Sequence, residues 1–193
     1  MMTIQRRRVV VLAVVVEGGL LLLAAILSRI LRIELVFASG HPLHDCLLAL
    51  PWTVFPLAVF VLSMNDKAMS FFIAPGRTWA FLKTMRQFVI QHIRAMFVST
   101  TLVDVVFICM LAGVSEEALF RGIIQARLGI IWASVIFGLL HFISPAYFIF
   151  ATVMGLYLGW VFVLYNGLFV PILVHFLYDL GAIVYLKYYV KEE

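Results

Sequence analysis

Apolar runs of about 20 residues recur through most of this sequence and restrict the possible folds more than any other feature. A helix that crosses a bilayer needs about 20 mostly apolar residues, because its backbone must satisfy its own hydrogen bonds inside the hydrocarbon. We therefore predict an all-α fold, a polytopic transmembrane helix bundle with about six spans. Their approximate ranges are 8–28, 45–64, 95–115, 130–143, 147–164 and 168–186.

The composition supports a membrane protein and leaves little room for a separate soluble domain. The chain has 193 residues, of which 65% are hydrophobic and 12% are charged, and its mean hydropathy is +1.11. A soluble domain usually carries about 25% charged residues. We expect residues 1–193 to form a single integral-membrane domain. Its two cysteines, Cys46 and Cys109, lie far apart and indicate neither a disulfide framework nor a structural zinc site.

The segment 65–94, between the second and third expected spans, differs from the rest of the chain. It mixes aromatic residues with Lys and Arg and is interrupted at Pro75-Gly76. This pattern predicts an amphipathic helix that lies at the membrane interface.

The basic residues suggest an orientation in the membrane, because positively charged loops favour the cytoplasmic side. Six spans would place both termini and the 65–94 segment on one side. That side would hold ten basic residues: Arg6, Arg7, Arg8, Lys67, Arg77, Lys83, Arg86, Arg94, Lys187 and Lys191. The other side would hold four: Arg29, Arg32, Arg121 and Arg127. We expect cytoplasmic termini, although the side to which the functional site opens stays undecided if 71–94 enters the bilayer. The net charge of +4 does not suggest a nucleic-acid partner.

The stretch "SEEALFRG" places three charges directly after an apolar run. Glu117 and Arg121 are four residues apart and share a helix face, so that they can neutralise each other. Glu116 points about 100° away and has no such partner, which suits a general base or acid. The alternative is a cluster of interfacial charges that all reach water.

Two later spans contribute histidines. His141 lies in "FGLLHF", one turn after Phe137, and His175 shares a face with Asp179 in "HFLYD". Each could simply form interhelical hydrogen bonds. Together, however, a carboxylate, two histidines and a second carboxylate are the parts of a hydrolytic site, and ionisable groups inside a membrane indicate function. With no serine or cysteine suitably beside a base, water is the expected nucleophile.

The ordered motifs resemble those of the CAAX protease and bacteriocin-processing family (CPBP, also called Abi) of intramembrane glutamic endopeptidases. They are Glu116-Glu117-x-x-x-Arg121, Phe137-x-x-x-His141 and His175-x-x-x-Asp179, and the resemblance covers about residues 95–186. It implies that Glu116 and His141 activate water, that His175 and Asp179 stabilise the oxyanion, and that Glu117 and Arg121 support the site. Well-understood members have asparagine at the position of Asp179, and aspartate can donate a hydrogen bond only when protonated.

The resemblance implies chemistry without a metal or other cofactor, and a membrane-associated protein or peptide as substrate. It also suggests the membrane of a prokaryotic cell. Two alternatives stay open. Glu116, His141, His175 and Asp179 could bind zinc, since two histidines and a carboxylate form a catalytic zinc set. A non-catalytic membrane scaffold or immunity protein could instead use the polar cavity for binding.

Two further acids lie inside spans. We expect Glu17 to face another helix and Asp104 to make an interhelical polar contact.

Overall fold

Helices account for nearly all of the described chain, and the residues that the structure describes contain no strand. The structure is a computed structural model that describes residues 6–37, 42–73 and 76–190. Its helices are α1 (Arg6–Leu31), α2 (Pro42–Ser63), α3 (Asp66–Phe72), α4 (Arg77–Phe88), η1 (Val89–Arg94), α5 (Ala95–Phe97), α6 (Leu102–Glu117), η2 (Ala118–Gln125), α7 (Ala126–Leu140), α8 (Pro145–Tyr165) and α9 (Phe169–Tyr188). The predicted all-α polytopic bundle is confirmed.

The described residues contain five helical stretches long and apolar enough to cross a membrane, and one of them, divided at Gly129, covers two of the six predicted spans. The third of them, Leu102–Leu140, combines the expected third and fourth spans. The predicted end at residue 115 is wrong, because the helix continues through the charged stretch as the π-helical segment η2. Glu117 and Arg121 form an ion pair there, and mutual neutralisation allows both charges to stay inside the helix.

The chain reverses direction at Gly129, where the backbone has φ 80° and ψ 168°. This conformation is essentially restricted to glycine. The rings of Phe120 and Phe137 are 4.9 Å apart between centroids, whereas 17 residues of straight helix would separate them by about 25 Å. The part of α7 after Gly129 therefore runs back along η2.

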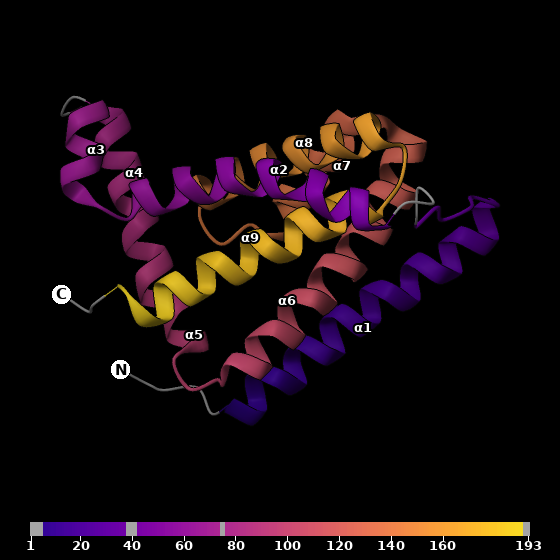
Figure 1. Cartoon of the computed structure of the whole chain (residues 1–193), viewed down its shortest axis with the longest axis horizontal. Coiled ribbons are helices and arrows are strands. Elements are labelled where there is room, and N and C mark those ends of the chain that lie inside the picture. Colours follow the sequence, from indigo (N-terminus) through magenta and orange to yellow (C-terminus); the bar gives the residue numbers. More distant parts are fainter. Residues whose placement is uncertain (1–5, 38–41, 74–75, 191–193) are drawn as a thin grey trace.

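Helices far apart in sequence pack side by side in the bundle. Figure 1 shows α1 along α6 and α2 along α9, while α7 and α8 form a further packed pair. At Gly113 an added Cβ would lie 3.1 Å from the carbonyl oxygen of Ile172, so α6 and α9 approach closely. Such small residues allow helix backbones to meet in membrane bundles. This contact places the last two turns of α6 against the first half of α9.

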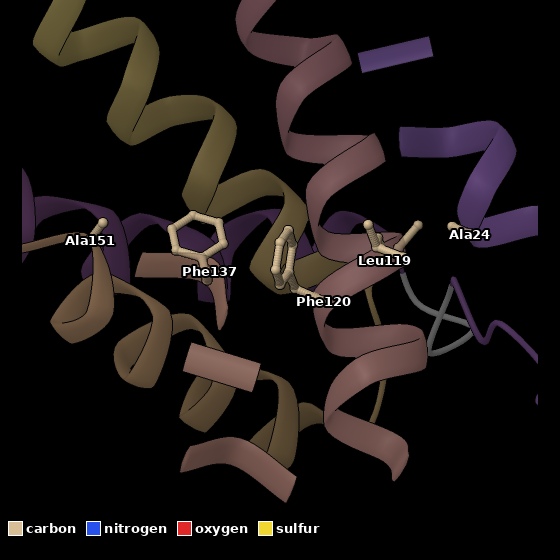
Figure 2. Close-up of a cluster of buried hydrophobic side chains, with 6 residues drawn as sticks. Ala24, Leu119, Phe120, Phe137 and Ala151 are labelled. Carbon is tan, nitrogen blue, oxygen red and sulfur yellow. The ribbon is translucent and has the colours of Figure 1, made fainter. Parts of the chain in front are cut away.

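A hydrophobic cluster supports the same region from α1, η2, α7 and α8. Figure 2 shows Phe120 and Phe137 edge to face, with Leu119 and Ala24 to one side and Ala151 to the other. The planes of the two rings are 84° apart. Edge-to-face geometry is favoured for aromatic pairs, and it holds Phe137 firmly one turn before His141.

The start of α1 and the end of α9 lie at the same end of the bundle (Figure 1). Arg6 donates two hydrogen bonds to Asp104, which is the interhelical contact expected for this acid. Lys187 donates to the carbonyl oxygens of Phe97, Val98 and Thr100 at 2.6–2.9 Å. Within 65–94, residues 66–72 form α3, and residues 77–94 form α4 and η1. Pro75 and, at the predicted basic side, Lys191 lie outside the described residues.

Candidate active site

Glu117 and Arg121 form a fully buried ion pair at the junction of α6 and η2. Arg121 Nε lies 3.0 Å from Glu117 Oε2, and both side chains are 0% exposed. The guanidinium carbon also lies 5.2 Å from the centre of the Phe137 ring, within the range of a cation–π interaction. The geometry is the one expected for residues four apart on a helix.

Glu117 has a second partner that the sequence did not predict. His175 Nδ1 on α9 donates a hydrogen bond of 2.9 Å to Glu117 Oε1. Arg121, Glu117 and His175 thus form a chain of contacts from η2 to α9. The contact depends on the close approach of the two helices at Gly113, which the motif spacing does not show.

Glu116 lies between the two histidines. Its Oε1 is 3.8 Å from His141 Nε2, and its Oε2 is 3.9 Å from His175 Nε2. Both distances exceed a direct hydrogen bond, but a single water can bridge groups separated in this way. Oε2 of Glu116 is buried and makes no hydrogen bond within the described part of the chain. This carboxylate oxygen therefore has unused hydrogen-bonding capacity.

His141 ends α7 and is oriented by Phe137. Its Nδ1 lies 2.9 Å from the carbonyl oxygen of Phe137, and the two rings stack with their centroids 4.3 Å apart. A carbonyl only accepts hydrogen bonds, so this contact assigns the proton to Nδ1. The other nitrogen, Nε2, then presents its lone pair toward Glu116.

Asp179 lies one turn after His175 on α9, with its side chain 31% exposed. Its Oδ2 is 3.4 Å from His175 Nε2. Both ring nitrogens of His175 therefore face carboxylates, Glu117 on one side and Asp179 on the other. This arrangement fixes the orientation of the ring.

These groups open into a cavity of about 360 Å³ within the bundle. The polar lining residues are Glu17, Glu116, His141, Tyr147, His175, Tyr178 and Asp179, together with the thiol of Cys109. The other lining residues are apolar and come mainly from α1, the 85–97 segment, α8 and α9. The cavity is thus polar around Glu116 and apolar over most of its wall.

Glu17 faces another helix, as expected, but it also reaches the cavity. It accepts a hydrogen bond of 2.5 Å from the Ser115 hydroxyl on α6. A carboxylate inside an apolar run is itself a signal for function, but Glu17 belongs to none of the three motifs. Tyr147 and Tyr178 gave no such signal, because tyrosines are common in packed cores.

No group of three or more His, Cys, Asp or Glu side chains among the described residues has a spacing that could hold a metal ion.

Comparison with known proteins connects this site to one enzyme family. Residues 97–181 match the family described as "Type II CAAX prenyl endopeptidase Rce1-like". The chain is also 34% identical over 89 residues to the uncharacterized protein YpbD of Bacillus subtilis (strain 168). That similarity covers 45% of this chain and 47% of the relative, so the chain spans about half of the relative's length. No solved structure is significantly similar to the chain. The resemblance inferred from the motifs is confirmed, and the matched segment contains all seven motif residues.

Proposed function

We propose that this chain is a membrane-embedded endopeptidase, the activity named for the Rce1-like family that residues 97–181 match. One observation carries the proposal: Glu116 lies between His141 and His175, on three separate helices, at the wall of a cavity. Catalytic groups must reach one small volume, and these three do. We further propose that the whole of 1–193 acts as one integral-membrane domain, since α1 and the 85–97 segment also line this cavity.

In the proposed reaction, Glu116 is the general base and His141 helps to position the attacking water. Glu116 takes a proton from the water while the water oxygen forms a bond to the peptide carbonyl carbon. The carbonyl π electrons move onto oxygen and form an oxyanion. When the oxyanion collapses, the C–N bond breaks and the proton passes from Glu116 to the leaving amine. The products are an amine and a carboxylate.

The remaining motif residues act on geometry and charge. His175, held by Glu117 and Asp179, places an imidazole beside the developing negative charge. Arg121 neutralises Glu117 and so keeps the carboxylate that orients His175 in place. These groups are fixed before the substrate binds, which is the condition for effective electrostatic stabilisation of a transition state.

The cavity wall suggests the chemical class of the substrate. Because the wall is largely apolar outside the site, we propose a membrane-associated protein or peptide with an apolar group next to the cleaved bond. A prenylated CAAX peptide, the substrate named for the family, has this character.

The proposal can be tested with the full chain reconstituted in proteoliposomes. A farnesylated CAAX peptide, the same peptide without the lipid and a transmembrane peptide would be incubated with the protein, and the products identified by mass spectrometry. We expect cleavage of at least one membrane-associated peptide, and activity retained with a metal chelator. Absence of cleavage of all three would contradict the proposal. Loss of activity on chelation, restored by zinc, would favour a metalloprotease.

A further inference from the structure

Hydrogen-bond donors are scarce at the polar end of the cavity. The three lining carboxylates, Glu17, Glu116 and Asp179, are acceptors when ionised. Among the described residues, no lysine, arginine, serine, threonine or asparagine lines the cavity. The thiol of Cys109 is only a weak donor. An oxyanion formed from a peptide carbonyl nevertheless requires donors aimed at it.

The N–H groups nearest the site are already in use. His141 donates through Nδ1 to the carbonyl oxygen of Phe137. Both nitrogens of His175 face carboxylates, at 2.9 Å from Glu117 and 3.4 Å from Asp179. At the start of α8, the backbone N–H of Tyr147 donates to the Ser144 hydroxyl at 3.1 Å.

Two phenol hydroxyls remain, those of Tyr147 in the first turn of α8 and Tyr178 on α9. Both residues line the cavity, and neither hydroxyl makes a hydrogen bond to any residue that the structure describes. The Tyr147 ring is held between Phe88 of α4 and Phe150, at 5.8 and 6.0 Å between ring centroids. A tyrosine whose ring is held by its neighbours loses little conformational entropy when its hydroxyl binds a partner.

The burial of the two side chains distinguishes them. Tyr178 is buried, and its ring packs edge to face against Phe60 with the ring centroids 6.2 Å apart. Tyr147 is only partly buried, and the charges of Asp179 and Glu116 both act on it. Tyr147 is therefore the more accessible of the two tyrosines to a substrate in the cavity.

We infer that Tyr147 is a further catalytic residue, whose hydroxyl donates a hydrogen bond to the oxyanion of the tetrahedral intermediate. This inference rests on the proposed endopeptidase function. Tyr147 keeps its proton throughout: the water oxygen bonds to carbon, Glu116 accepts the water's proton, and the carbonyl electron pair becomes the oxyanion that the hydroxyl contacts. Collapse of the intermediate releases that hydrogen bond as the C–N bond breaks. Asp179, as a carboxylate, orients His175 instead of donating to the oxyanion.

The test compares Tyr147→Phe with Tyr178→Phe and with Tyr185→Phe as a matched control. Tyr185 is on the same helix as Tyr178 but does not line the cavity. The peptide that the wild type cleaves, among the three used above, serves as the probe, and kcat, KM and the melting temperature are measured for each variant. We expect kcat of Tyr147→Phe to fall by about 10²–10³-fold, the usual loss of an oxyanion donor, with KM and melting temperature unchanged. Tyr185→Phe should resemble the wild type, and any loss of kcat in Tyr178→Phe should be much smaller than the loss in Tyr147→Phe.

Unchanged kcat in Tyr147→Phe, or a loss confined to Tyr178→Phe, would overturn the assignment while leaving the endopeptidase function intact. No cleavage by the wild type would contradict the endopeptidase function and this inference with it. If Tyr147→Phe also loses stability, the pH dependence of kcat is measured for Tyr147→3-fluorotyrosine, which keeps the ring and the hydroxyl but has a lower hydroxyl pKa. Loss of activity at a lower pH than in the wild type supports the donor role, and a pH profile identical to that of the wild type contradicts it.

Discussion

The ion pair of Glu117 and Arg121 is the most deeply buried charged contact around the site, and removing one partner should be costly. Arg121→Ala leaves Glu117 buried with only His175 beside it. Breaking a buried pair from one side typically costs about 3–5 kcal/mol. We therefore expect a lower melting temperature and a lower folded yield in detergent, along with reduced activity.

A matched control is Arg6→Ala at the end of the bundle, where the arginine side chain is 56% exposed. Solvent screens such a pair, so its loss should have a much smaller effect. If Arg121→Ala were as stable as the wild type but inactive, Arg121 would have to act on the substrate or the transition state and not on the fold.

The site shows which residue contacts a sequence can predict. The pairing of Glu117 with Arg121 follows from helix geometry alone, because residues four apart share a face. The contact of Glu117 with His175 does not follow, since it joins residues 58 positions apart. It requires the crossing of α6 and α9 at Gly113, which is a property of the packed bundle.

At the level of elements, the reversal at Gly129 determines where His141 lies. Nothing stands within 4 Å of an added Cβ at this position, so a substitution there would strain the backbone without a clash. Non-glycine residues in such a conformation cost about 1–3 kcal/mol. We expect Gly129→Ala to lower stability by this amount, measured by denaturant unfolding in mild detergent, and to reduce activity through displacement of α7.

Gly19→Ala is the control for a change from glycine to alanine. Gly19 lies within α1, also with nothing within 4 Å of an added Cβ. Alanine there should be neutral or stabilise by about 0.5–1 kcal/mol. Equal effects of the two substitutions would argue against a glycine-dependent reversal at residue 129.

Apolar length predicted most of the spanning helices, and its error at the end of the third span has a physical cause. The expected span 95–115 stops just before Glu116 and Glu117, because charged residues are unfavourable inside a membrane-spanning helix. The helix continues because Arg121 neutralises Glu117 within the same helix. Hydropathy counts charges singly and does not recognise a pair that cancels.

For the molecule as a whole, the structure predicts that both termini lie on one side of the membrane. Asp104 at the start of α6 contacts Arg6 near the start of the chain, while Thr100 contacts Lys187 near its end. Protease should therefore digest both epitope tags in vesicles of one orientation and neither tag in vesicles of the opposite orientation. We propose that this side is cytoplasmic, because it carries most of the basic residues. Tags digested from opposite sides would contradict the arrangement of the bundle.

The proposed role of Glu116 is to activate the attacking water, and Glu116→Gln tests this role most directly. Glutamine keeps the volume and the hydrogen bonding of the side chain but cannot take a proton from water. Cleavage and melting temperature would be measured together for Glu116→Gln, for Glu117→Gln and for Glu34→Gln, an exposed carboxylate outside the helices.

We expect Glu116→Gln to keep the wild-type melting temperature and to lose at least the ~10²–10⁴-fold in rate that a general base contributes. Glu117→Gln should lose stability as well as activity, because it removes the charge that neutralises buried Arg121, and Glu34→Gln should change neither. Full activity in a stably folded Glu116→Gln protein would contradict the assignment of the base.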